Sequence, residues 1–456
     1  MFLLVATTIV GVYGVQQSFE IEQPITPRLN PNLQGKVLAP VTGGFASCFL
    51  TRINAANNEY IVQLDTGSSD TALPHSSLNN YAGDSIKYDI GVNSTELRSS
   101  YADGSYWLGH EVEIPLGIHG TNLMGQSPVA LMTKQSKTPV FTSGSPSQGL
   151  MGLAFPIISE LHANPPTVMD AWFKNGQIKK NEIALHGCPY TMQSKSWIDF
   201  GNETPYTDCG GRSVTISIPF KSYFTLNVKS ISISGSSQTL PKQFQAASKK
   251  FSAGYAWSIL DSCTSVIVLP DSIVVDLQNK IKASGGFSKT ITSEAYYFSA
   301  FLDAQGAIQI SKDEINWNLL PSLSFVITSD LGDIELVIGP RQYIQYDTTG
   351  YINMLVVGGG DDFAVLGLPI FSAYHIVLDR LNGRVSFALG CGCNSSPDGY
   401  PKIIQKAKST NNQNDEIVDT LTITPSISQT SKNQGTDTEP FSYLMQLLYI
   451  TYVAIL

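Results

Sequence analysis

The chain has 456 residues, of which 42% are hydrophobic and only 14% are charged. This length is enough for two domains of ordinary size, each with its own core, so folding does not require disulfides. The net charge of -9 and the lack of any Lys/Arg run argue against a nucleic-acid-binding groove. The many Tyr, Phe, Ser, Thr and Gly residues favour a mostly β fold.

The chain begins with an apolar run, MFLLVATTIVGVYG, which ends in small residues. Although no basic segment precedes it, its length predicts a secretory signal peptide over residues 1–14. Residues 15–38 would then be a short propeptide. Three N-glycosylation sequons agree with this route, and they begin at Asn93, Asn202 and Asn394.

The stretch YIVQLDTGSSDTALP, residues 60–74, predicts a buried strand that runs into a tight turn. The turn opens with an acidic residue, Asp65, and continues with hydroxyl residues and a glycine. Taken alone, this composition is also typical of ordinary turns. A catalytic interpretation therefore needs a partner for Asp65.

A hairpin is predicted next, in the segment ELRSSYADGSYWLGHEVEIPLG at residues 96–117. Asp103-Gly104 lies between runs of strand-forming residues, which is a strong turn signal. On this segment alone, the alternative is a surface hairpin in which Tyr101 has no special role.

The residue pattern of the first motif recurs in SILDSCTSVIVLP, residues 258–270. Each motif has a proline nine positions after its aspartate, Pro74 after Asp65 and Pro270 after Asp261. The other matched pairs are Leu64 with Leu260, Thr66 with Ser262, Ser68 with Thr264, Ser69 with Ser265, and Leu73 with Leu269. An apolar segment with a central glycine follows each motif, GLMGLAF at 149–155 and AVLGLPI at 364–370. The repeats predict two similar halves.

These paired motifs resemble those of pepsin-like aspartic proteases, and the resemblance covers residues 40–393 in order. It implies two β-rich lobes related by an approximate twofold axis, with the active-site cleft between them. The N-terminal lobe would span residues 39–208 and the C-terminal lobe residues 209–395. The segment FSAYHIVLDRLNGRVSFA, residues 371–388, resembles the last hairpin of the second lobe.

The resemblance also assigns site residues. Asp65 and Asp261 would be the catalytic dyad. Thr66 and Ser262 resemble the pair that ties the two aspartate loops together, and Tyr101 occupies the place of the flap tyrosine. The implied supporting residues are Thr66, Gly67, Ser68, Tyr101, Ser262 and Thr264.

Two carboxyl groups in one site can carry out both proton transfers of peptide hydrolysis. Because two like charges a few ångströms apart do not both ionise easily, the pair keeps one proton, which is a known property of aspartic proteases. We therefore expect a secreted or cell-surface aspartic endopeptidase that cleaves polypeptides at acidic pH. We expect it to be a monomer in the secretory pathway, outside the cell or in an acidic endolysosomal compartment, and to use no metal or organic cofactor.

The second motif departs from the family at Cys263, where glycine is expected. A glycine permits close approaches that a Cβ obstructs. An alternative is therefore a catalytically inactive protein that keeps the fold and binds peptides or another partner. A thiol at this position would also make the protein redox-sensitive, or it would pair with another cysteine such as Cys209.

The six cysteines allow 15 pairings, and the sequence alone does not choose among them. Disulfides suit a secreted chain, although several buried thiols are the alternative. The family resemblance implies that Cys188 pairs with Cys391 or Cys393. No zinc-ligand spacing occurs, and the six histidines are scattered.

Residues 396–440 are rich in polar residues, a composition that predicts a solvated linker. The chain ends in an apolar tail, 441–456, whose 14-residue stretch YLMQLLYITYVAIL is too short to span a bilayer as a helix. The tail and spacer resemble a signal for a glycosylphosphatidylinositol (GPI) anchor, with attachment near 433–435. The alternative is a membrane-associated or docked terminal helix.

Overall fold

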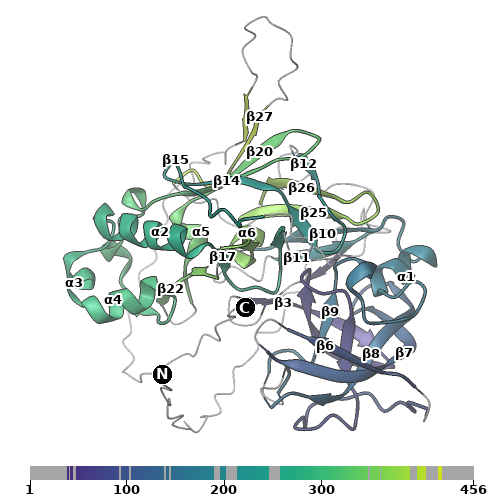
Figure 1. The fold of residues 1–456 in the computed structure, drawn as a ribbon. Coiled ribbons are helices and arrows are strands. Elements are labelled where there is room, and N and C mark those ends of the chain that lie inside the picture. The colour runs from purple at the N-terminus through teal and green to yellow at the C-terminus, as the bar shows by residue number, and fades with distance from the viewer. Residues whose placement is uncertain are drawn as a thin grey trace, which may run out of the picture.

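The computed structural model describes residues 38–40, 42–44, 48–91, 94–101, 104–137, 140–142, 145–188, 196–201, 213–245, 257–347, 350–359, 361–390, 398–406 and 420–423. Strands predominate in this part of the chain, and they form five sheets. Figure 1 shows two halves, with the purple to blue N-terminal elements on one side and the green C-terminal elements on the other. The prediction of a mostly β fold with two lobes is confirmed.

The N-terminal half contains an eight-stranded sheet. In sheet order its strands are β2 (Thr42–Gly44), β3 (Cys48–Ala55), β4 (Asn58–Asp65), β9 (Gly149–Gly152), β5 (Thr71–Pro74), β8 (Met124–Gln135), β7 (Tyr106–Ile118) and β6 (Glu96–Ser100). In β4, buried and partly exposed side chains alternate from Tyr60 to Leu64, as expected for a strand with one face in the core. Helix α1 (Val168–Lys174) follows, and the side chain of Thr167 caps its first turn.

The C-terminal half contains three sheets. The five-stranded sheet has the order β13 (Phe224–Leu226), β16 (Ser258–Leu260), β24 (Val365–Leu366), β17 (Ile267–Leu269) and β23 (Val356–Gly358). A six-stranded sheet has the order β15 (Ser236–Ser237), β14 (Val228–Ile233), β19 (Leu323–Ile327), β20 (Asp333–Ile338), β27 (Lys402–Lys406) and β28 (Thr420–Ile423). The three-stranded sheet has the order β18 (Ile308–Gln309), β22 (Tyr351–Met354) and β21 (Ile344–Tyr346).

Several helices lie in the C-terminal half, and some of them are on its outer side (Figure 1). They are α2 (Asp271–Ser284), α3 (Lys289–Ser293), α4 (Ala295–Leu302), α5 (Pro340–Tyr343) and α6 (Leu368–Phe371). Short 3-10 helices are η2 (Pro156–Ile158), η5 (Lys312–Glu314) and η6 (Trp317–Leu319). Helix α2 buries Ile273, Leu277 and Ile281, which are four residues apart and therefore share one face. It ends at Gly285, whose φ of 68° fits a left-handed helix cap.

A six-stranded sheet joins the two halves. Its order is β1 (Leu38–Pro40), β11 (Trp197–Phe200), β10 (Glu182–His186), β25 (Tyr374–Asp379), β26 (Arg384–Leu389) and β12 (Ser213–Ser217). The antiparallel pair β10–β25 brings together strands about 190 residues apart in the chain. Strands β25 and β26 form the predicted last hairpin, with Gly383 at a φ of 66° in its turn.

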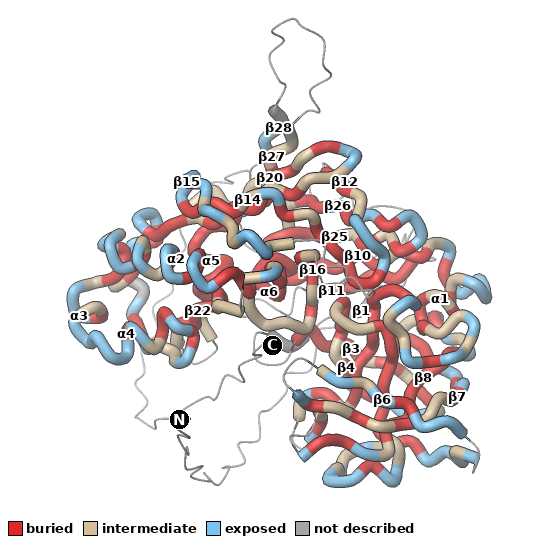
Figure 2. The backbone as a smooth tube through the Cα atoms, in the orientation of Figure 1, coloured by how far each residue is buried: buried red, intermediate tan, exposed pale blue. Residues whose placement is uncertain are grey.

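One hydrophobic cluster runs from the N-terminal half through the joining sheet into the C-terminal half. In Figure 2 the buried strands form a continuous red interior, whereas the outer faces of α2, α3 and α4 are exposed. A smaller cluster around Trp107 and Phe141 lies beneath the hairpin of β6 and β7. The site described below therefore rests on rigid, packed strands.

Strands β27 and β28 differ from the sequence prediction, which placed residues 396–440 in a linker without structure. Strand β27 pairs with β20, and β28 pairs with β27. The polar segment carries Ile403 and Ile404, and the buried Ile403 adds to the core of the neighbouring sheet. The linker prediction is thus wrong for these two segments, and the C-terminal sheet extends beyond residue 395.

The terminal predictions lie largely outside the described residues. These include the signal peptide at 1–14, the propeptide at 15–38 apart from Leu38, and the apolar tail at 441–456. Within the described ranges, the longest helices are too short or too polar to traverse a bilayer.

Candidate active site

The two aspartates occupy equivalent places at the ends of strands. Asp65 is the last residue of β4 and lies opposite Gly152 in the parallel pair β4–β9. Asp261 directly follows β16, and its backbone N–H donates to the carbonyl of Leu366 in β24 at 3.2 Å. Strand β9, which ends in Gly152, and strand β24, which Gly367 directly follows, each lie between the strand before the aspartate loop and the strand after it. The repeat predicted from the sequence therefore corresponds to a repeated arrangement of strands and aspartate loops in the structure.

The glycines of the two apolar segments permit this arrangement. A Cβ on Gly152 would lie 2.3 Å from the backbone carbon of Ser69. A Cβ on Gly367 would lie 2.1 Å from the carbonyl oxygen of Val266. No side chain fits at either position, because the loop backbone passes directly over each glycine.

Four hydrogen bonds tie the two aspartate loops together. The Thr66 hydroxyl donates to the carbonyl of Leu260 at 3.0 Å and accepts from the Ser262 N–H at 2.9 Å. Reciprocally, the Ser262 hydroxyl donates to the carbonyl of Leu64 at 2.6 Å and accepts from the Thr66 N–H at 3.0 Å. Both side chains are fully buried, so these bonds are shielded from water. The structure thus places Thr66 and Ser262 as a pair that joins the loops.

Each carboxylate is held by an amide two residues later and a hydroxyl three residues later. Asp65 accepts from the Gly67 N–H at 2.7 Å and from the Ser68 hydroxyl at 2.5 Å. Asp261 accepts from the Cys263 N–H at 2.9 Å and from the Thr264 hydroxyl at 2.6 Å. Such bonds fix the orientation of each carboxylate.

The two carboxyl groups lie close together. A Cβ on Gly67 would be 2.8 Å from the carboxyl atoms of Asp261, so glycine is needed there. Burial raises the pKa of Asp65 to about 8, and the charge of Asp261 and a hydrogen bond with its side chain add to this effect. Asp65 is 5% exposed, whereas Asp261 is partly open to solvent. Burial and the nearby carboxyl group thus both favour the protonated form of Asp65.

Tyr101 lies directly after β6, in the hairpin that β6 forms with β7. Its hydroxyl accepts a hydrogen bond from the indole Nε1–H of Trp107 at 2.9 Å, and its ring packs against the cluster around that residue. Burial raises the pKa of Tyr101, and the charges of Asp65 and Asp70 act in the same direction. The hydroxyl therefore stays protonated. Gly104 has a φ of 81°, as its place in the turn requires.

Cys263 forms a disulfide with Cys48, the first residue of β3. The predicted pairing with Cys209 is wrong, and there is no reactive thiol at residue 263. Among the described cysteines none is free, so the alternative of buried thiols is also wrong for them. Cys188 is disulfide-bonded too, but Cys209, Cys391 and Cys393 lie outside the described residues, so the pairing implied for Cys188 stays a prediction.

Two of these contacts are absent from the sequence-based predictions. Nothing in the sequence could choose Cys48 as the partner of Cys263, because 215 residues separate them. Trp107 lies in β7, the strand that follows the turn after Tyr101 in the predicted hairpin. A buried indole N–H needs an acceptor, so a tryptophan and a tyrosine in one hairpin are a usable signal.

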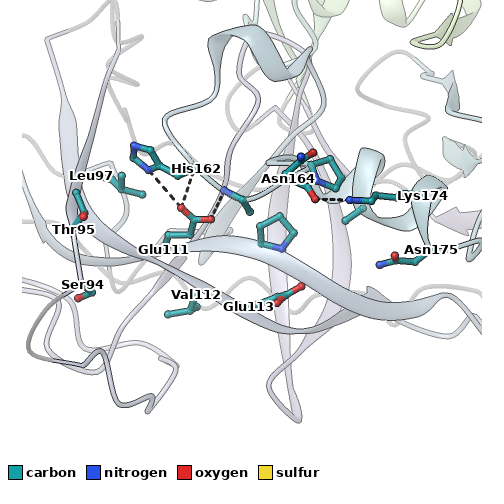
Figure 3. A pocket seen from close by; sticks show the side chains of 14 residues that line it. Ser94, Thr95, Leu97, Glu111, Val112, Glu113, His162, Asn164, Lys174 and Asn175 are labelled. Atoms are coloured by element: carbon teal, nitrogen blue, oxygen red, sulfur yellow. Dashed lines mark hydrogen bonds and ion pairs between the residues drawn. The ribbon is translucent and has the colours of Figure 1, made fainter.

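A separate pocket of about 650 Å³ lies in the N-terminal half. Figure 3 shows it between β7 and the segment before α1, with Glu111 accepting from the backbone of His162 and Ala163. It includes neither aspartate, so we do not assign the chemistry to it. Within the described ranges, no group of three or more His, Cys, Asp or Glu side chains is placed to hold a metal ion.

Comparison with known proteins agrees with this geometry. The family model for the eukaryotic aspartyl protease matches residues 50–390, which is most of the chain. The chain belongs to the eukaryotic aspartyl protease family. Its similar relatives include pepsin A of Sus scrofa, 24% identical over 74% of this chain and 79% of the pig protein. Pepsin A of Bos taurus is 24% identical over 74% of this chain and 82% of its own length.

A fungal relative extends the comparison. Candidapepsin-2 of Candida parapsilosis is 26% identical over 61% of this chain and 64% of its own length. In this chain, the region matched by the family model begins within β3 and ends after β26, so it contains both aspartate loops, the hairpin of Tyr101, and strands β9 and β24. Cys48 lies two residues before the matched region, and Cys263 lies within it.

Proposed function

We propose that this protein is an aspartic endopeptidase that hydrolyses peptide bonds with a water molecule activated by Asp65 and Asp261. The observation that carries the proposal is the pair of carboxyl groups, delivered by equivalent loops and close enough to share a proton. The pair titrates as a unit, so its two roles belong to the pair.

The chemical steps follow from that arrangement. The ionised member of the pair takes a proton from water, and the protonated member donates its proton to the carbonyl oxygen of the substrate. The hydroxyls of Ser68 and Thr264 keep the carboxylates oriented as the charge moves between them. Tyr101 would close over the substrate and limit access of bulk water. No step in this scheme uses a metal or an organic cofactor.

The decisive experiment is cleavage of a denatured protein between about pH 3 and 6. We expect the natural protein to cleave, and Asp65→Asn to lose nearly all activity because the pair then lacks one of its carboxyl groups. Asp276→Asn is the matched control, since Asp276 is exposed on α2 and should not matter. A hydroxyl-containing transition-state inhibitor such as pepstatin should block cleavage. Activity that survives Asp65→Asn would refute the assignment.

The second candidate is an inactive protein that binds peptides, and Cys263 in place of glycine is the observation behind it. The Cys263 N–H nevertheless donates to Asp261 much as the Gly67 N–H donates to Asp65, which favours the active form. The double variant Cys48→Ala/Cys263→Gly separates the two. An inert natural protein and an active double variant would establish the inactive form.

We further propose that the protein travels the secretory route and acts as a monomer at the cell surface or in an acidic compartment. The disulfide supports this, because such bonds persist in oxidising compartments. Ser94 and Thr95 of the first sequon are exposed. Loss of mass on deglycosylation, release from membranes by a phosphatidylinositol-specific phospholipase, and a monomeric mass by light scattering are the expected results.

A further inference from the structure

The Cys48–Cys263 disulfide joins the two halves at the aspartates themselves. Cys263 lies two residues after Asp261, and Cys48 begins β3, with the two Cα atoms 4.6 Å apart. Strand β3 is the immediate neighbour of β4, which ends in Asp65. The bond therefore connects the strand beside the first aspartate to the loop of the second.

At its C-terminal-half end, the bond fixes a group that touches the dyad. The backbone N–H of Cys263 is one of the two donors to the Asp261 carboxylate, and the next residue, Thr264, supplies the other. Any displacement of residue 263 moves one of these donors directly. The disulfide thus acts one hydrogen bond away from the carboxylate.

At its other end, the bond is attached to an anchored strand. Cys48 is 7% exposed and is followed by Phe49 and Leu50 in the core. Leu50 lies opposite Gln63 in the antiparallel pair β3–β4, two residues before Asp65. Cys48 itself has a φ of 61°, a left-handed conformation that is unfavourable for a residue with a Cβ. Cys48, one of the two residues of the disulfide, therefore has a left-handed backbone conformation.

The equivalent position in the first loop is Gly67. A side chain there would meet the Asp261 carboxyl group, whereas the side chain of Cys263 is held toward β3 by its sulfur partner. The two loops match in their other contacts to the carboxylates and to each other. The difference between the halves is thus concentrated at this covalent link.

We propose that the Cys48–Cys263 disulfide is a positioning element of the active site, which holds the loop of Asp261 against β3 and so sets the separation of the two carboxyl groups. The proposal rests on the proposed peptidase function. Both cysteines act through Asp261 and need not touch substrate. Because displacements of about 1 Å can cost on the order of 100-fold in rate, loss of the bond should lower kcat more than it raises KM.

Reduction after folding is the first test. Dithiothreitol donates two electrons and two protons, so that the protein gains two thiols and the reagent becomes a cyclic disulfide. We expect kcat to fall about tenfold or more and to recover on reoxidation. The double variant Cys48→Ala/Cys263→Ala should start with the low kcat and show no further response to the reagent. A variant that still responds would assign the effect to the disulfide of Cys188 and overturn the proposal.

The second test restores the family residue without the bond. In Cys48→Ala/Cys263→Gly we expect kcat to stay low and the alkaline limb of kcat/KM to move toward lower pH, because looser carboxyl groups share their proton less strongly. A merely structural bond would lower Tm and leave kcat and this limb unchanged. That result would overturn the proposal.

The third measurement separates this proposal from the peptidase function. Tm is measured against pH for the natural protein and for Asp65→Asn, each with and without the disulfide. The difference between the two proteins gives the part of the fall in Tm with rising pH that depends on Asp65. A smaller Asp65-dependent loss in the reduced proteins supports positioning even if no substrate is cleaved. An equal loss in both states overturns positioning, whereas inert oxidised protein contradicts only the peptidase function. Reduction of folded protein keeps the test available if a variant does not fold.

Discussion

Gly67 affects the position of both aspartates. Its N–H donates to the Asp65 carboxylate, and its missing side chain leaves room for the carboxyl group of Asp261. The same residue therefore holds one member of the pair and admits the other. Ordinary turn preferences would explain a glycine here without either contact, so substitution distinguishes the two accounts.

We predict that Gly67→Ala abolishes most activity while the fold persists. The new Cβ would lie 2.8 Å from the Asp261 carboxyl atoms, which must then move away from Asp65. A shift of this size should lower kcat on the order of 100-fold. Gly91→Ala is the matched control, because a Cβ there meets nothing within 4 Å. Equal kcat in the two variants would contradict the assigned contact.

At the scale of single elements, the hairpin of β6 and β7 carries its own support for Tyr101. Trp107 is 1% exposed, and its indole N–H is directed at the tyrosine hydroxyl. The contact lies within one hairpin, so the two residues can move together as the hairpin opens or closes. Trp107 would then set the position of Tyr101 in both states.

We predict that Trp107→Phe weakens substrate binding and turnover together. A neutral hydrogen bond contributes about 1 kcal/mol, so kcat/KM should fall roughly fivefold from this loss alone. A double-mutant cycle with Tyr101→Phe isolates the contact from the smaller ring volume. Strictly additive effects of the two substitutions would show that the hydrogen bond has no role in turnover.

The joining sheet contains a second element-scale feature, the cross-strand pair His186 and His375 of β10 and β25. Burial lowers the pKa of His375 to about 4, and the neighbouring His186 adds to this effect. The folded pKa is below the unfolded value of about 6.5, so the fold favours the neutral ring. Its contribution to stability is present above pH 6.5 and is lost as the pH falls through about 4.

We predict that the free energy of unfolding falls by up to roughly 3 kcal/mol as this ring becomes protonated. Thermal unfolding between pH 7 and 3 measures the loss, and His375→Phe should make the curve flatter over this interval. His162→Phe is the control, because the side chain of His162 is 72% exposed. If both variants keep the natural slope, another group sets the acid limit.

At the scale of the whole molecule, a buried ion pair supplements the covalent link between the halves. Arg380, at the end of β25, donates to both carboxylate oxygens of Asp170 in α1 at 2.8 and 2.9 Å. It also donates to the carbonyl of Ala154, just beyond the first glycine-bearing strand. Burial opposes the charge of Asp170, but the charge and hydrogen bonds of Arg380 prevail and lower its pKa.

We predict that Arg380→Met destabilises the protein by about 3 kcal/mol, since it leaves the partly buried Asp170 without its charged partner. The midpoint of denaturant unfolding measures this loss. Arg384→Met, at an exposed position on β26, should change stability by less than about 0.5 kcal/mol. A similar small change in both variants would show that the pair contributes little.

Local patterns predicted much of this molecule. The duplicated aspartate motifs were enough to place Asp65 and Asp261 in matched loops, because their spacing repeats within each half. Contacts between distant segments could not be predicted in this way, since Cys48–Cys263 and Arg380–Asp170 depend on how the halves pack. Strand β27 could not be predicted for a related reason. The segment is polar overall, and its place in the sheet depends on one buried side chain, Ile403, and on pairing with β20.

The disulfide has one more consequence, which concerns damage to the chain. Residues 48 and 263 enclose nearly all of the N-terminal half in a covalent ring. A single backbone break anywhere inside this ring opens it without separating the pieces. Cleavage at one site between residues 48 and 263 would therefore leave both carboxyl groups in the same covalent molecule.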